Sequence, residues 1–125
     1  MGTFSDLVAN SWLDAVARAA AYSEAGVYVK LHLGDPGTDG TANAALNTTR
    51  QQATFGSAAT GRAISNTAVV EWTSVPNTEV YTWISLWDAS TGGNFLGRDD
   101  LSSSASVTAG DTFRIPIGDL DLTVT

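Results

Sequence analysis

The chain contains no cysteine and a single histidine among its 125 residues. Without cysteine there is no disulfide, no thiolate nucleophile and no cysteine-ligated metal. A lone histidine excludes a pair of histidine metal ligands, and it leaves any serine–histidine arrangement dependent on His32. No G-x-S-x-G pattern surrounds any serine. His32 alternates with apolar neighbours, so we expect a surface histidine and not a catalytic one.

Positive charge is also scarce. Six Lys and Arg residues stand against thirteen Asp and Glu, which gives a net charge of −7. Phosphate backbones attract positive proteins, so we expect no nucleic-acid partner. The chain has no apolar run long enough to cross a bilayer and no signal-peptide pattern, so we expect no membrane association. Charged residues make up only 15% of the chain, which is typical of surfaces that other proteins cover.

Helical periodicity is confined to the segment 1–25. Its apolar residues recur at intervals of three and four, and an alanine-rich run with high helix propensity follows them. The pattern predicts a helix over about 4–23 that stops before Gly26. Its apolar stripe must cover either the protein's own sheet or a neighbouring subunit. We expect this stripe to be the partner interface, formed by Leu7, Val8, Trp12 and Val16.

From residue 26 onward the apolar period changes to two, and turn residues recur about every ten positions. This predicts a mainly β fold over 26–125, an antiparallel β-sandwich or barrel-like domain of seven to eight strands in one compact unit. The segment 81–101 is expected to supply a central strand followed by a glycine-bearing hairpin. Ser102–Ser104 is a weak break after it. The segment 34–50 is interpreted as a surface loop.

Acidic residues occur in three arrangements that could serve a site. Asp35 and Asp39 resemble half of a calcium loop, although position twelve is leucine, so we expect a plain turn. The pairs Asp99–Asp100 and Asp119/Asp121 could suggest glycosidase chemistry. A solvated strand face explains Asp119 and Asp121, Asp99–Asp100 closes a hairpin strand, and the sequence indicates no burial that would raise a pKa in either pair. We therefore predict no catalytic residue, no metal and no cofactor. The four tryptophans are expected in the core, with sugar stacking as the alternative; they are Trp12, Trp72, Trp83 and Trp87.

Three motifs resemble a known family. They are L-H-L-G-D-P-G-T-D-G-T-A-N at 31–43, I-S-L-W-D-A-S-T-G-G-N-F-L at 84–96 and A-G-D-T-F-R-I-P-I-G-D-L-D-L-T-V at 109–124. The chain resembles small virion structural proteins of tailed phages of actinobacteria, the mycobacteriophage type. Members are variously labelled capsid decoration, minor tail or tail-fibre proteins. The likeness covers about residues 27–125 and carries over no catalytic or binding residues.

The resemblance implies a non-enzymatic virion protein made in the cytoplasm of the bacterial host. A small acidic domain without a shaft or repeats favours capsid decoration. The expected partners are then the major capsid protein and copies of the chain itself, for example in a trimer. The alternative is a minor tail or tail-fibre protein that binds host or cell-wall glycans.

Overall fold

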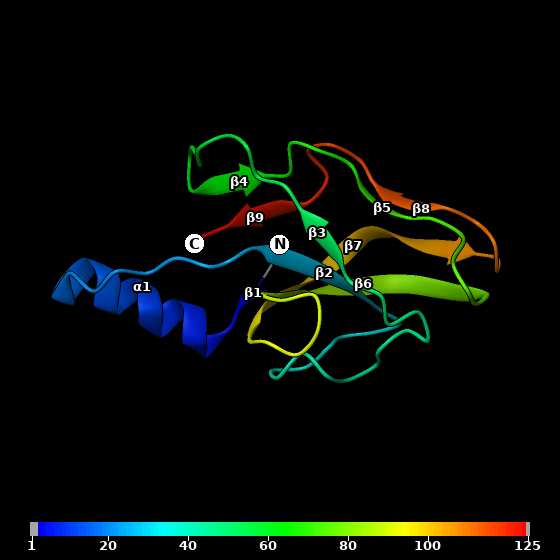
Figure 1. Cartoon of the computed structure of the whole chain (residues 1–125), viewed down its shortest axis with the longest axis horizontal. Helices are drawn as coiled ribbons and strands as arrows, with labels where there is room; N and C mark the ends of the chain where they lie inside the picture. The colour runs from blue at the N-terminus through cyan, green and yellow to red at the C-terminus, as the bar shows by residue number, and fades with distance from the viewer. Residues whose placement is uncertain (1–2, 125) are drawn as a thin grey trace.

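The computed structural model describes residues 3–124, and within them one helix is followed by eight strands. A two-residue strand precedes the helix. Figure 1 shows the arrangement. The elements are β1 (Thr3–Phe4), α1 (Asp6–Arg18), β2 (Val27–His32), β3 (Gln51–Ala53), β4 (Ala63–Ser65), β5 (Val70–Trp72), β6 (Glu79–Trp87), β7 (Phe95–Val107), β8 (Phe113–Ile115) and β9 (Asp121–Thr123).

The strands form an open, sandwich-like structure. One antiparallel sheet has five strands in the order β1-β7-β6-β2-β3, and two short ribbons pair β4 with β9 and β5 with β8. Figure 1 shows the ribbons on one side of the large sheet and the segment 33–50 on the other. The expected antiparallel β fold with one N-terminal helix is therefore confirmed, as a sandwich and not a closed barrel.

Strand β6 is the centre of the large sheet, as its sequence predicts. It pairs with β2 on one side, where Ile84 faces Leu31, and with β7 on the other, where Leu86 faces Gly97. Ile84 and Leu86 are buried. Because both faces of this strand are covered, large side chains alternate along it without a polar face.

Strand β7 continues through the serine run that the sequence marks as a break, but its pairing with β6 slips there. Tyr81 pairs with Ala105 and Trp83 with Asp100, so Thr82 alone lies opposite the residues 101–104. The weak break at Ser102–Ser104 thus corresponds to an irregular bulge of several residues inside one strand.

Asn66 directly follows β4 and lies at the junction between β4 and β5. Its buried side-chain amide donates to the carbonyls of Ala68 and Pro116 at 2.8 and 3.0 Å. Its oxygen accepts from the backbone N–H groups of Gly118 and Leu120 at 3.0 and 2.9 Å. One buried amide therefore fixes the junction of both ribbons, which a hydrophobic pattern cannot reveal.

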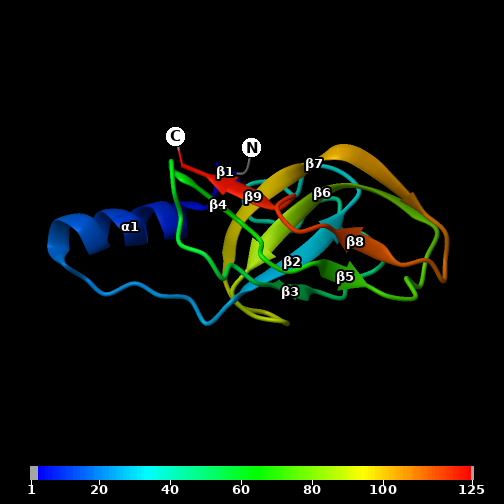
Figure 2. The same ribbon diagram turned by 90° about the horizontal axis from the view of Figure 1, so that it is seen from above.

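The helix is shorter than its sequence suggests. It begins after Ser5, whose hydroxyl accepts from the N–H of Val8, and it ends where Ala19 adopts a left-handed conformation (φ 54°). Residues 19–26 are irregular or extended. No helix within residues 3–124 has the length and apolar character needed to cross a bilayer. Helix α1 and residues 19–26 together form a projection from the β domain, here called the arm (residues 5–26), visible in Figures 1 and 2.

Candidate functional site

The root of the arm is fixed to the large sheet. Strand β1 pairs with β7 through Phe4 and Gly97, and the N–H of Ser5 donates to the carbonyl of Leu96 at 2.8 Å. Val8 is 3% exposed and belongs to the core, and Trp12 packs edge-on against Phe4 with ring centroids 4.7 Å apart. Two of the four residues predicted as partner interface, Val8 and Trp12, therefore contact the protein's own β domain.

The helix carries uncovered apolar side chains, most of all in its distal part. Val16 is 88% exposed there, and Leu7 in the first turn is 41% exposed. Leu13, which the sequence prediction omitted, is 66% exposed. Leu13 and Val16 are three positions apart and so lie on the same face of the helix, together with the exposed Ala9. The three-residue spacing of Leu13 and Val16 in the sequence could have identified this face of the helix. We call Ala9, Leu13 and Val16 the arm face.

The charged residues of the helix interact with the helix itself and do not cover its apolar side chains. Asp6 lies in the first helical turn and Arg18 in the last, which suits the helix dipole. Arg18 also forms an exposed ion pair with Asp14 at 3.4 Å. These charges stabilise the helix from within, so they do not require a charged partner.

His32 is fully buried, so the prediction of a surface histidine is wrong. Its Nδ1 lies 2.9 Å from the carbonyl of Ala42 and its Nε2 2.7 Å from Oγ of Ser85. Because a carbonyl can only accept, Nδ1 carries the proton and Nε2 accepts from the Ser85 hydroxyl. The Ser85 oxygen accepts in turn from Nε1 of Trp87 at 2.7 Å.

This histidine–serine contact is structural. Both side chains are 0% exposed, so a substrate has no access to the Ser85 oxygen. Burial lowers the pKa of His32 below its usual value, and the hydrogen bond to Ala42 offsets part of that effect. The imidazole is therefore neutral near pH 7, and it joins the segment 33–50 to the sheet.

The segment 33–50, here called the covering loop, is also more buried than a surface loop. Ala45 and Asn47 are both 3% exposed. The carboxylate of Glu79 accepts from the backbone N–H groups of Leu46 and Asn47 at 2.6 and 3.2 Å. Polar contacts therefore hold the loop against one face of the sheet. Its small polar residues had suggested a surface loop instead.

The two aspartates that resemble a calcium loop serve the turns of the covering loop. Oδ1 of Asp35 accepts from the N–H of Gly37 at 2.9 Å and from Arg98 at 2.8 Å. Oδ1 of Asp39 accepts from the N–H and hydroxyl of Thr41, which lowers the pKa of Asp39. These contacts support the plain-turn interpretation. Within residues 3–124 no three potential ligands cluster as a metal site would require.

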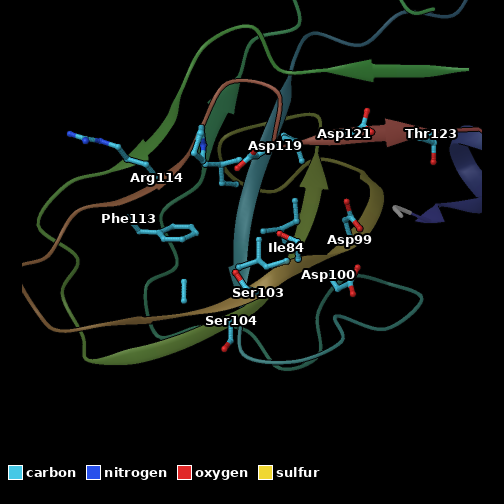
Figure 3. Close-up of a pocket in the computed structure, with 16 residues that line it drawn as sticks. Ile84, Asp99, Asp100, Ser103, Ser104, Phe113, Arg114, Asp119, Asp121 and Thr123 are labelled. Carbon is cyan, nitrogen blue, oxygen red and sulfur yellow. The ribbon is translucent and has the colours of Figure 1, made fainter. Parts of the chain in front are cut away.

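A cleft of about 630 Å³ lies between β7 and the segment that carries β8 and β9. Figure 3 shows Asp99 and Asp100 on one side, Asp119 and Asp121 on the other, and Phe113 projecting inward while Arg114 points away. The two predicted acidic pairs are thus brought to one cleft.

The acidic pairs differ in burial. Asp119 and Asp121 are exposed as expected, but Asp99 is only 9% exposed, and this burial raises its pKa. The expectation that neither pair contains a buried carboxylate is wrong for Asp99. The hydroxyls of Ser102–Ser104 complete the rim of the cleft.

All four tryptophans are at least half-buried. Trp72 and Trp87 are buried, at 2% and 8% exposure, and Trp12 and Trp83 are half-buried. Trp87 also packs beneath the guanidinium of Arg50, whose carbon lies 4.2 Å from the ring centroid. The expectation of core tryptophans is confirmed for Trp72 and Trp87, and a fully exposed stacking platform for sugars is absent at all four.

Comparison with known proteins places these surfaces in context. The sequence model of a family described as Podophage GP4 fiber I protein gp80 matches residues 3–123. No curated protein matches the chain. The matched span includes the arm, the covering loop and the cleft.

Proposed function

This chain belongs to the family of Podophage GP4 fiber I protein gp80, and we propose that it is a tail-fibre component that joins other virion proteins through its arm. Membership makes it a phage virion structural protein, and the family's description favours a fibre. The match over residues 3–123 carries the proposal, because it spans both the β domain and the projecting helix. A host among actinobacteria, as the three sequence motifs suggest, is a narrower part of the same proposal.

The family changes the preferred position within the virion. The sequence alone favoured capsid decoration with the major capsid protein as partner, because the chain has no shaft or repeats. The family's description supports a fibre and gives no support to the capsid surface. A compact module without a shaft can serve a fibre as an attached subunit, so we propose placement on the tail.

The arm face supports the proposed mode of attachment. Leu13 and Val16 are the large apolar side chains of α1 that the β domain leaves most exposed. Burying an exposed valine or leucine side chain against a partner lowers the free energy by about 1.5–3 kcal/mol each. A partner with an apolar groove would receive this face as a short amphipathic helix. We therefore propose a protein partner and neither nucleic acid nor membrane.

Assembly of virions with altered arm faces tests this proposal. The double change L13D/V16D should leave the β domain folded and remove the protein from purified particles. D14N is the matched control, because it alters a half-buried polar residue on the same helix and should be incorporated normally. Full incorporation of L13D/V16D would exclude the arm face as the attachment site.

Position and copy number in the virion test the placement separately. Cryo-EM of intact particles should show the β domain on the tail, in a handful of copies. Hundreds of copies on the capsid lattice would instead restore the capsid-decoration hypothesis, whatever the arm contacts.

A second candidate function is glycan binding in the cleft. The cleft offers serine hydroxyls, carboxylates on two sides and the ring of Phe113, the groups with which proteins hold sugars. Titration of host cell-wall oligosaccharides followed by NMR should shift the signals of Ser102–Ser104 and Phe113. A D121N variant should weaken these shifts. Unchanged spectra with all wall fractions would remove this candidate.

A further inference from the structure

Two positive side chains lie opposite each other on the face of the large sheet that carries the covering loop. Strands β2 and β3 pair Val29 with Gln51. One step further, the same antiparallel register brings Arg50 opposite Lys30. Opposite residues of antiparallel strands project from the same face, with Cβ atoms about 5 Å apart. Lys30 shares its face with His32, two positions along β2, whose ring contacts the covering loop.

The two cations affect each other. Like charges that lie opposite on neighbouring strands destabilise the pairing. Burial lowers the pKa of Lys30, and the positive charge of Arg50 lowers it further. Both side chains are half-buried, so water screens their repulsion only in part. An anion bound beside both of them would remove this repulsion.

The protein's own carboxylates do not balance this pair, although acidic residues outnumber basic ones by thirteen to six. Within residues 3–124, the ion pairs with carboxylates belong to other basic residues, namely Arg18, Arg98 and Arg114. Burial lowers the pKa of Arg50, and the negative charge of Asp88 offsets part of this effect. The two oxygens of Asp88, however, accept from the backbone and side-chain N–H groups of Asn94 at 2.6 and 2.8 Å.

Arg50 is fixed in position by contacts that leave part of its guanidinium available. Its Nη1 donates to the carbonyls of Ala89 and Gly92 at 2.8 and 2.7 Å. Its Cζ lies 4.2 Å from the centroid of the Trp87 ring. In the part of the chain that the structure describes, the hydrogen bonds of Arg50 use Nη1 alone, so Nε and Nη2 remain as donors. A guanidinium that is already ordered loses little conformational entropy when it binds an oxyanion.

Gln52 adds a neutral donor to the same face. It lies two positions after Arg50 and opposite Tyr28, and it is exposed. An ammonium, a guanidinium and an amide thus lie along one stretch of the sheet. Two positive charges with an additional donor match an anion that has several oxygens and two negative charges. A phosphate monoester carries nearly two negative charges near pH 7, whereas a carboxylate carries one.

We propose that Lys30, Arg50 and Gln52 bind a phosphate group, either free or as a monoester, on the covering-loop face of the sheet. The net negative charge of the chain opposes binding of polyanions, but a single phosphate interacts mainly with the cations beside it. This site uses neither the arm nor the cleft, so it is independent of how the protein is attached in the virion.

Titration of the full-length chain with inorganic phosphate, followed by NMR, tests the site. The signals of Lys30 and of the Arg50 and Gln52 side chains should shift and saturate, and sodium chloride at equal ionic strength should not reproduce this. Saturation by glycerol 3-phosphate as well would support a monoester as the ligand, and saturation by inorganic phosphate alone would support free phosphate. Acetate that binds as tightly as phosphate, or phosphate shifts that do not saturate, would overturn the proposal.

Four variants test which residues carry the binding. K30Q removes the ammonium and should weaken phosphate binding by at least about tenfold. Q52E places a carboxylate beside the two cations and should weaken it as well. K30R restores the charge and should restore binding. R62Q is the matched control, because it removes the same charge from an exposed residue directly before β4, and it should bind like the parent chain.

Near-ultraviolet circular dichroism separates loss of the site from loss of the fold. The spectrum of K30Q should match that of the parent chain, because Lys30 forms no ion pair within residues 3–124. Phosphate binding that is unchanged in K30Q would overturn the proposal. An equal loss in K30Q and R62Q would also overturn it, because binding would then follow the net charge of the protein and not this site.

Discussion

The arm and the covering loop both leave the large sheet, but they are held in opposite ways. The covering loop is rich in small polar residues, and it lies against the sheet because His32 and Glu79 bind its backbone. The arm is rich in apolar residues, yet beyond Val8 and Trp12 its helix leaves large apolar side chains in solvent. In this protein, amino-acid composition does not predict which of the two segments is buried.

The difference has a physical reason. A buried acceptor aimed at backbone N–H groups can fix a loop without apolar side chains. If the hydrogen bonds to the loop were not made, a buried polar group would be left without a partner, and this costs free energy. An apolar helix face is stabilised only where a surface meets it. The sheet offers such a surface to the root of the arm alone, so the remainder is available for another protein.

Glu79 should give the largest effect on stability. E79A leaves the N–H groups of Leu46 and Asn47 without their acceptor, and we expect a loss of about 2–3 kcal/mol in the free energy of unfolding, measured by denaturant titration. E79Q keeps one acceptor oxygen and should lose less. An E79A variant as stable as the parent would show that the covering loop is held by other contacts.

Alanine substitutions at Val8 and Val16 compare the contributions of the root and the tip of the arm to the free energy of unfolding. V8A removes two buried methyl groups and should cost about 2 kcal/mol. V16A removes the same atoms from an exposed position and should change the free energy of unfolding by less than about 0.5 kcal/mol. Equal losses at both positions would mean that the arm face is already covered in the isolated protein.

His32 should make the covering loop sensitive to mild acid. Its pKa in the folded protein is lowered, so between that pKa and about 6.5 the unfolded chain binds more protons than the folded one. The contribution of His32 to the free energy of unfolding is therefore fully present above about pH 6.5. It decreases as the pH falls below that value, by at most about 1.4 kcal/mol per pH unit.

Denaturant titrations from pH 8 to pH 5 measure this effect. In H32N, which retains an amide donor toward Ala42, the acid-dependent loss should disappear in this window. The arm should contribute nothing to it, because none of its residues is a histidine. An identical pH profile in the parent chain and in H32N would contradict the assignment to His32.

The smallest stability effect should come from the arm face itself. L13D/V16D alters two exposed side chains and should leave the thermal midpoint within a few degrees of the parent value. Its consequence should appear only in particle assembly. A large loss of thermal stability would mean that this face packs within the protein.

The amino-acid sequence determined the class of fold and its central strand. The period of two after residue 26, the two-sided apolar pattern of 81–87 and the glycine-bearing turn at 88–94 are local signals, and each appears in the structure. Local signals also placed the arm's helix, although its end at Ala19 was missed because alanine rarely adopts a left-handed conformation.

Only the tertiary structure decided what each polar residue does. His32, Asn66 and Glu79 look like surface residues in sequence, but their partners lie 10 to 53 positions away for His32, up to 54 for Asn66 and up to 33 for Glu79. Long-range hydrogen bonds leave no periodic trace in a sequence. For the same reason, the tertiary structure alone divided the arm's apolar stripe into a covered root and an open face.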